Sequence, residues 1–311
     1  MTTSRVGIVI PVLNGARELK HLLPILKAEP GDNTILIIDS QSTDGTEEAV
    51  STIPNIRWHQ ISRSEFNHGA TRELGRRMVG TEIVVFLTQD VIPEPGFLAR
   101  LVEPVTSGRA SVSYSRQRPH DGARFFEAFP REYNYPDGGN IRSLEDAPKY
   151  GVYAFFCSDS AAAYSNAALD SIGGFEPILT NEDYFAVAKL LKAGHRIAYV
   201  SDSIVRHSHS YTLKDEFRRY FDTGYVRAEH RWVTSLVGQA EGRGAAFART
   251  MLASLAREAP WLIPYALLQI AAKWLGYRVG FFSYRLSRGW CRRLSSQRYY
   301  WGSVHCRHPA K

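Results

Sequence analysis

Cysteine is scarce in this chain of 311 residues, and its three copies, Cys157, Cys291 and Cys306, are odd in number and widely spaced. They predict neither a zinc clip nor a disulfide framework, so we interpret them as reduced thiols. A signal peptide is missing as well, because the apolar run at 6–12 is short and lacks the basic and small-residue flanks of such a segment. We expect the protein to stay in the cytoplasm.

Motifs for dinucleotides and nucleic acids are also lacking. No G-x-G-x-x-G follows the first predicted strand, which removes the physical reason for a dinucleotide pyrophosphate to bind there and disfavours a Rossmann-type dehydrogenase. The sequence has no internal repeat and no recognisable nucleic-acid-binding motif, so we expect no nucleic-acid partner. Its residues are 44% hydrophobic and 12% aromatic, which is enough for a globular core.

Positive charge is concentrated towards the C-terminus. Residues 210–311 contain 17 Lys and Arg against 6 Asp and Glu, whereas residues 1–209 contain 21 against 25. A basic segment of this kind is typical of contact with anionic lipid or a phosphorylated substrate, and the alternative is a merely solvated basic face. We expect contact with an anionic membrane surface.

The first two thirds of the chain alternate short β-branched runs with segments of helical period, as an α/β sheet with crossover helices requires. Strands are predicted at 6–12, 34–39, 56–61, 82–88, 110–115 and 197–200, and helices at 68–79, 95–106 and 182–193. Another helix is predicted by the apolar face of Leu19, Leu22, Leu23 and Leu26. We predict a doubly wound, Rossmann-like domain over residues 1–210, followed by a basic and mostly helical extension over residues 211–311.

The segment 125–150 breaks this pattern with aromatic, Pro- and Gly-rich sequence. Because it is longer than an ordinary connection, we predict a loop there, which is either a binding loop or an inert surface excursion.

The segment 260–286 is long and mostly apolar, but a proline, a glutamine and two basic residues interrupt it too often for a comfortable membrane span. Gln269, Lys273, Gly276 and Gly280 share one helix face, with broad apolar flanks on either side. An interfacial membrane helix and a helix packed within the fold or in a homodimer both fit this pattern.

Polar residues follow the first two predicted strands, and in an open parallel sheet ligands bind beyond the carboxyl ends of the strands. Pro11 and Asn14 stand at the end of the first strand, and Asp39 and Ser42 at the end of the second. We expect Asp39 to accept hydrogen bonds from a nucleotide base or ribose, and Ser42 and Asp44 to cap the helix that follows them. The alternative is plain turn chemistry.

Gln89 and Asp90 close the fourth predicted strand, where one carboxylate is sufficient to hold a divalent cation that bridges two phosphates. His207 and His209 follow another strand-like segment and are candidates to complete the metal shell. Because alternate residues of an extended segment point to opposite faces, we expect only one of these histidines to face the site.

Glu182 and Asp183 begin an amphipathic helix, a position where the helix dipole favours a carboxylate and is expected to lower its pKa. Acids at such positions are usually caps, but the Gly173-Gly174 turn just before this helix brings its start back towards the ligand edge of the sheet. Arg72 is a candidate to direct positive charge towards a diphosphate, and the alternative is an ordinary surface position.

Taken together, these motifs resemble the family 2 glycosyltransferases of the GT-A fold over about residues 6–211. I-P-V-L-N at 10–14, D-S-x-S-x-D-G-T at 39–46, T-Q-D at 88–90, G-G-F at 173–175 and E-D at 182–183 occur in that family's order and spacing. F-N-H-G-A-T-R at 66–72 and H-S-H-S-Y at 207–211 are similar to the subgroup of rhamnosyltransferases that build bacterial surface polysaccharides.

The resemblance implies roles for individual residues. Asp39 is expected to bind the nucleotide base, Asp90 the diphosphate and a divalent metal, Mg²⁺ or Mn²⁺, and Asp183 to act as the catalytic base. Thr88 stands where the family's usual Asp-x-Asp motif has its first acid, so His207 or His209 is expected to compensate. The remaining expected contacts with the nucleotide-sugar are Pro11, Asn14, Ser42, Arg72, Gln89 and Glu182.

The implied reaction is inverting transfer of a sugar, L-rhamnose from dTDP-L-rhamnose, to a hydroxyl of a lipid-linked surface-polysaccharide intermediate. Its expected place is the inner face of the cytoplasmic membrane. The alternative is a non-catalytic protein of the same fold that binds sugar nucleotides or glycans.

Overall fold

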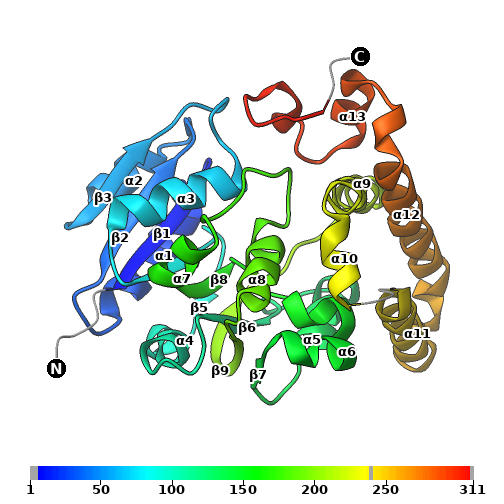
Figure 1. The fold of residues 1–311 in the computed structure, drawn as a ribbon, viewed down its shortest axis with the longest axis horizontal. Helices are drawn as coiled ribbons and strands as arrows, with labels where there is room; N and C mark the ends of the chain where they lie inside the picture. Colours follow the sequence, from blue (N-terminus) through cyan, green and yellow to red (C-terminus); the bar gives the residue numbers. More distant parts are fainter. Residues whose placement is uncertain (1–5, 238–240, 309–311) are drawn as a thin grey trace. The chain divides into compact units, whose positions relative to one another are not determined.

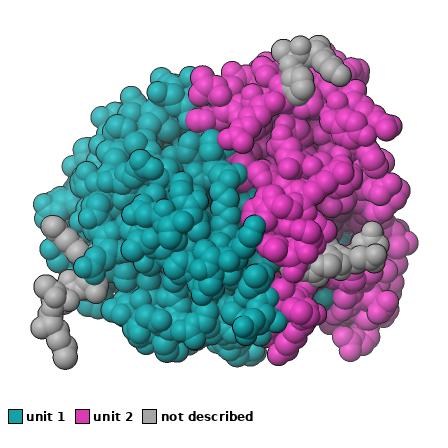
Figure 2. Space-filling model, in the orientation of Figure 1, with its two compact units in different colours: residues 1–146, 155–177, 182–208 teal, residues 147–154, 178–181, 209–311 magenta. Residues whose placement is uncertain are grey.

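The structure is a computed structural model, and it describes residues 6–237 and 241–308. The chain divides into two compact units (Figure 2). Unit 1 consists of residues 1–146, 155–177 and 182–208, and unit 2 of residues 147–154, 178–181 and 209–311. The sequence placed a domain boundary after residue 210, whereas the compact units change at residue 208 and two short earlier segments also belong to unit 2.

Unit 1 is built on a mixed sheet (Figure 1). The order of strands across it is β3-β2-β1-β4-β8-β6-β9-β5, and β7 pairs with β9. β3, β2, β1 and β4 are mutually parallel, β8 is antiparallel to both β4 and β6, and β6 is parallel to β9. The strands are β1 (Val6–Val12), β2 (Thr34–Asp39), β3 (Ile56–Gln60), β4 (Ile83–Leu87), β5 (Ile92–Pro93), β6 (Val112–Arg118), β7 (Asn140–Arg142), β8 (Ala161–Ser165) and β9 (Ile197–Arg206).

Helices cover both faces of this sheet. The predicted leucine face of α1 packs into one core with inward residues of β1, β2, β4 and α4. On the other face α3 lies so close to β1 that a Cβ built on Gly75 would be 2.4 Å from Val9 Cγ1. The helices of unit 1 are α1 (Ala16–Ala28), α2 (Thr46–Ser51), α3 (His68–Val79), α4 (Phe97–Thr106), α5 (Phe125–Asn134), α7 (Asn166–Ser171) and α8 (Glu182–Lys192). The predicted α/β class, a mixed sheet with helices on both faces, is confirmed.

The direction of β8 determines what reaches the ligand edge of the sheet. Leu87, the last residue of β4, pairs with Ala161, the first residue of β8. The residues that precede an antiparallel strand therefore lie at the edge where the residues that follow parallel strands also lie. β5 is antiparallel to the end of β9 through the pair Ile92 and Arg206, which brings the segment just before β5 to the same edge.

Two details of the sequence prediction were wrong. The segment 125–150 is not one long loop, because α5, β7 and the short helix α6 (Ala147–Tyr150) occupy most of it. Phe125, Phe129 and Tyr133 are spaced four residues apart, and their rings stack along α5. The second error divided one strand: 197–200 and the later strand-like segment are both parts of β9, joined through an irregularity in its pairing with β6.

Unit 2 is helical, as the sequence predicted for this part of the chain. Besides α6 it contains α9 (Leu213–Glu229), α10 (Arg231–Val237), α11 (Glu241–Glu258), α12 (Ile263–Phe281) and α13 (Arg288–Leu294). Figure 1 shows α12 as a long helix beside α9 and α11. Within the described residues, no helix is both long and apolar enough to cross a membrane.

The contact between α9 and α12 is unusually close because glycines line it. A Cβ on Gly276 would lie 2.2 Å from the carbonyl oxygen of Phe217, and one on Gly280 would lie 2.0 Å from that of Phe221. Buried Glu216 also contacts Lys273, with 3.3 Å between Oε1 and Nζ. The small and polar face of α12 is therefore its inward face.

Candidate functional site

The loops after β1 and β2 are joined by side-chain hydrogen bonds. The backbone N–H of Asn14 donates to Ser42 Oγ at 2.7 Å, and its side-chain oxygen accepts from the N–H of Thr43 at 2.9 Å. Asp44 accepts from the N–H of Ala16 at 3.0 Å. Because β1 and β2 are parallel neighbours, their loops lie side by side, and Ser42 and Asp44 bond the segment that leads into α1. Asp44 also accepts a hydrogen bond from the hydroxyl of Thr46, the first residue of α2, as predicted, whereas Ser42 bonds Asn14 rather than α2.

Asp39 ends β2 with a fully buried side chain. Its carboxylate accepts a hydrogen bond from the N–H of Ser42 at 3.0 Å and another from Gln60 Nε2 at 3.2 Å. The hydroxyl of Ser42 also donates to it. These bonds fix the orientation of the carboxylate at the carboxyl end of the parallel strands, the edge where Pro11 of β1 also lies.

Gln89 connects the end of β4 to the end of β1. Its side-chain oxygen accepts from the N–H of Leu13 at 2.9 Å, and its NH₂ group donates to the carbonyl of Leu13 at 3.2 Å. The two bonds imitate a backbone pair between segments 76 residues apart. Gln89 therefore holds the loop that carries Asn14 in register with the loop that carries Asp90.

Asp90, His207 and His209 offer ligand atoms that all lie within 4.8 Å of one another. His207 is buried, with its Nε2 3.4 Å from Asp90 Oδ2 and its Nδ1 3.0 Å from Gln117 Oε1. An amide oxygen only accepts, so Nδ1 carries the proton and the Nε2 lone pair faces Asp90. The expectation that only one histidine faces the site was wrong, because β9 ends at Arg206 and the alternation of an extended strand does not continue through His209.

The chemistry of this donor set fits a divalent metal. Burial lowers the pKa of His207, which favours the neutral imidazole that binds metals. One carboxylate oxygen and two imidazole nitrogens suit Mn²⁺ better than Mg²⁺, since Mg²⁺ prefers oxygen ligands. Gln117 fixes the ring of His207 from the opposite side, the usual arrangement around a metal-binding histidine.

A second group of charges surrounds the start of α8. Arg72 is buried, with its Nη1 2.8 Å from Glu182 Oε1 and its Nε 3.0 Å from Asp159 Oδ2. The half-buried Asp183 accepts a hydrogen bond from the backbone N–H of Asp159 at 3.3 Å. Tyr164 donates its hydroxyl to Asp159 at 2.6 Å. The structure therefore places Arg72 between two carboxylates, in the interior rather than at the surface.

Three carboxylates near one guanidinium leave an excess of negative charge in this group. Burial raises the pKa of Asp183 well above its ordinary value, and the charges of Asp159 and Glu182 raise it further. The predicted lowering by the helix dipole was wrong, since these effects outweigh it. A carboxylate with a raised pKa is, when ionised, a stronger proton acceptor, which suits a general base.

Asp159 is the residue that sequence reasoning missed. It precedes β8, whereas the search considered residues that follow strands. Only the antiparallel direction of β8 brings it to the ligand edge, and the C-S-D-S run at 157–160 is its only local signal.

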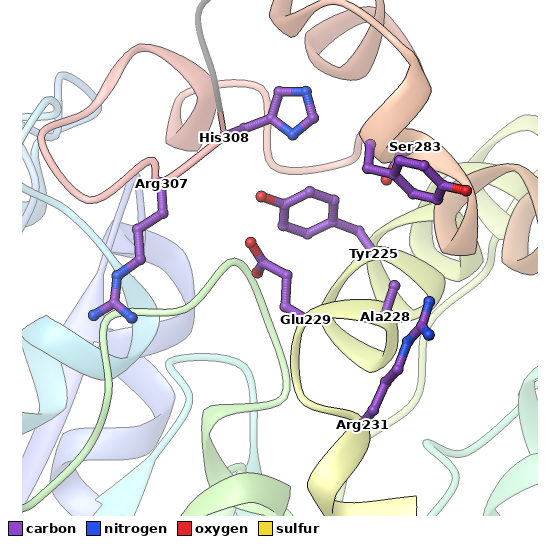
Figure 3. A pocket seen from close by; sticks show the side chains of 8 residues that line it. Tyr225, Ala228, Glu229, Arg231, Ser283, Arg307 and His308 are labelled. Carbon is purple, nitrogen blue, oxygen red and sulfur yellow. The ribbon is translucent and has the colours of Figure 1, made fainter.

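Unit 2 contains a separate cavity of about 380 Å³ (Figure 3). Tyr225 and Glu229 of α9 line one side of it, and Arg307 and His308 line another. Burial raises the pKa of Glu229. None of the residues that line this cavity was predicted as a site residue.

Comparison with known proteins identifies the family of the chain. The profile of glycosyl transferase family 2 matches residues 7–173. The O-antigen chain rhamnosyltransferase RfbN of Salmonella typhimurium is 33% identical over 304 residues, which cover 96% of this chain and 97% of the relative. WbaN of Salmonella anatum, also an O-antigen chain rhamnosyltransferase, is 36% identical over 302 residues and 96% of each chain.

The fold has close structural counterparts as well. The mannosyltransferase PcManGT from Pyrobaculum calidifontis, solved with GDP-Man and Mn²⁺, superposes with a TM-score of 0.61 at 17% identity, covering 91% of this chain and 88% of its own. At that identity the likeness concerns the fold alone. With the family profile and the two relatives, it leads to one conclusion: the chain belongs to glycosyl transferase family 2 and is a glycosyltransferase of the GT-A fold.

Proposed function

We propose that this glycosyltransferase moves L-rhamnose from dTDP-L-rhamnose to a hydroxyl of a lipid-linked O-antigen intermediate, with inversion at the anomeric carbon. The observation that carries the proposal is the group of Arg72, Asp159, Glu182 and Asp183 at the start of α8, in which Asp183 is the carboxylate that we propose as the proton acceptor. The choice of sugar and acceptor is supported by the two O-antigen chain rhamnosyltransferases, which match almost the full length of the chain.

The proposed chemistry is a single displacement. Asp183 takes the proton of the acceptor hydroxyl while the oxygen of that hydroxyl forms a bond to the anomeric carbon. The bond from the anomeric carbon to the diphosphate breaks on the opposite face, and the nucleotide diphosphate leaves. General-base catalysis of this kind contributes roughly 10²–10⁴-fold to the rate. Asp39, Ser42, Asn14 and Pro11 form the proposed nucleotide side of the site, and alignment of the two substrates contributes the rest.

Arg72 and Glu182 are proposed to act on the donor site indirectly. Arg72 makes its short contacts with Glu182 and Asp159. We therefore propose that its positive charge acts on the diphosphate at a distance, without a direct contact. Asp90, His207 and His209 would hold a divalent metal, for which Mn²⁺ is our choice. Such an ion supplies positive charge that stabilises a leaving diphosphate.

The proposed acceptor determines where in the cell the enzyme acts. A lipid-linked glycan made in the cytoplasm is reached at the inner face of the cytoplasmic membrane, so we include contact with an anionic membrane surface in the proposal. The excess of basic residues in 210–311 supports it.

The first test replaces the base. Asp183→Asn removes a proton acceptor but keeps the shape of the side chain, so turnover should fall by roughly 10²–10⁴-fold while donor binding is retained. Asp202→Asn, which changes an exposed aspartate of β9, is the matched control and should leave turnover unchanged. Near wild-type turnover of Asp183→Asn would refute the assignment of the base.

The second test separates an enzyme from a binding protein of the same fold. Nucleotide diphosphate release is measured for a panel of nucleotide-sugars with lipid-linked acceptor, and thermal shift is measured with dTDP and Mn²⁺. The proposal expects release with dTDP-L-rhamnose and stabilisation by dTDP. Stabilisation without release from any donor would favour the non-catalytic alternative.

A further inference from the structure

An ordinary amphipathic helix buries its apolar face, whereas α12 buries its polar and small residues. Its polar and small residues, Gln269, Gly276 and Gly280, are buried against α9. Its outward face carries large apolar side chains instead. The sequence could not decide between an inward and an outward apolar face, because both flanks of the polar stripe are apolar.

The outward apolar residues lie in two rows along α12 and the 3₁₀ turn just before it, Pro260–Leu262. Trp261 is 73% exposed, Leu268 57% and Trp274 64%. Leu267 and Leu275 are also about half exposed. Trp261, Leu268 and Leu275 are spaced seven residues apart, and so are Leu267 and Trp274, so the residues form two rows on the outward side of the helix. Contiguous exposed apolar surface of this kind marks a site of interaction with another apolar phase.

From Trp261 onwards the charge is of one sign. No Asp or Glu occurs in the sequence after Glu258, whereas nine Lys and Arg do. Arg278 and Arg285 stand at the C-terminal end of α12 and just beyond it, and Arg292 and Arg293 stand on α13, all with exposed side chains. Trp290 of α13 is also exposed, at 55%.

Two occupants are chemically reasonable for this surface, and its charge favours one. A second copy of the chain would place two segments without any acid against each other, and like charges repel across a contact. An anionic bilayer surface attracts the same arginines, while tryptophan and leucine side chains enter the boundary between headgroups and acyl chains. A span is excluded for α12, which is not apolar enough to cross a membrane.

We infer that α12, the 3₁₀ turn before it and α13 form a membrane-docking surface. α12 would lie in the plane of an anionic leaflet, with Trp261 of the turn and Leu268 and Trp274 of α12 inserted. This inference rests on the proposed function, because the membrane surface is where the enzyme would reach a lipid-linked acceptor. Binding to lipid is measured without any sugar transfer, so failure of either idea is recognised separately.

The experiment is flotation of the full chain with phosphatidylcholine vesicles that either contain or lack phosphatidylglycerol, at low and high salt. The full chain should float with the anionic vesicles, less so at high salt and little with phosphatidylcholine alone. Arg278→Gln combined with Arg285→Gln should weaken partitioning about thirtyfold at low salt, since each basic residue near the surface contributes a factor of about five. Arg57→Gln, an exposed change in β3, should have no effect.

The apolar contribution is tested with Trp274→Ser, and Ile141→Ser, an exposed change in β7, is its control. Trp274→Ser should reduce flotation at both salt concentrations while circular dichroism and dTDP-induced thermal shift stay as in the parent chain. Three results would overturn the inference. The first is equal flotation with both kinds of vesicle, and the second is no flotation with either. The third is a dimer that Trp274→Ser converts to monomer without changing flotation.

Discussion

Replacing Gly276 by alanine tests how closely α12 packs on α9. In an exposed helix this change adds stability, by up to about 1 kcal/mol, because alanine has the higher helix propensity. Here the new Cβ would lie 2.2 Å from the carbonyl oxygen of Phe217 and 3.0 Å from its carbonyl carbon, atoms of backbone that cannot rotate away. Overpacking of this kind costs about 1–3 kcal/mol, so the cost exceeds the gain and we expect net destabilisation.

The matched control is Gly244→Ala in α11, where a Cβ has nothing within 4 Å. It should raise the free energy of unfolding by about 0.5–1 kcal/mol, so the two substitutions should have effects of opposite sign. Thermal unfolding of the full chain measures both, and a change of 1 kcal/mol moves Tm by roughly 2–4 °C in proteins of comparable size. If Gly276→Ala stabilised the chain as much as Gly244→Ala, the close approach of α12 and α9 would be refuted.

Other predictions concern the candidate site. Asp90→Ala should weaken donor binding and metal activation together, and an enzyme whose activity EDTA does not change would contradict it. Gln117→Leu should weaken Mn²⁺ activation by about 10–100-fold, since it frees the ring of His207, a proposed metal ligand; normal activation would argue against this role of Gln117. Asp39→Ala should raise the donor KM by roughly tenfold or more and affect kcat less, and a pure kcat effect would be inconsistent with base binding. With Asp183 as the proposed base, activity should decline as pH falls through the raised pKa of that group. Asp159→Asn removes a charge that raises this pKa and should shift the decline to lower pH, measured as kcat against pH.

The strands predicted correctly were those with a strong local signal. β1 and β2 are buried on both faces and appear in the sequence as continuous apolar runs, so their ranges were predicted to the residue. β8 was not predicted, because its sequence A-A-A-Y-S has no β-branched residue. Strand direction also depends on pairing partners far away in the sequence, which local periodicity does not contain.

The same limit explains what was and was not foreseen at the site. Asp39, Asp90 and Asp183 were recognisable from motifs in order along the chain, and their proposed roles stay predictions. Asp159 could not be found without the antiparallel direction of β8. The internal contacts of Arg72 could not be found either, because they join α3 to residues 87 and 110 positions later.

The paired hydrogen bonds between Gln89 and Leu13 have a consequence for the energetics of donor binding. Together with the bonds of Asn14 to Ser42 and Thr43, they link three loops into one frame before any ligand arrives. The conformational entropy of ordering these loops is then lost when the chain folds rather than when the donor binds. A donor that matches the fixed spacing meets a preorganised site, and a donor that does not match gains little from loop rearrangement. Discrimination between nucleotide-sugars should therefore depend on complementarity of shape more than on induced fit.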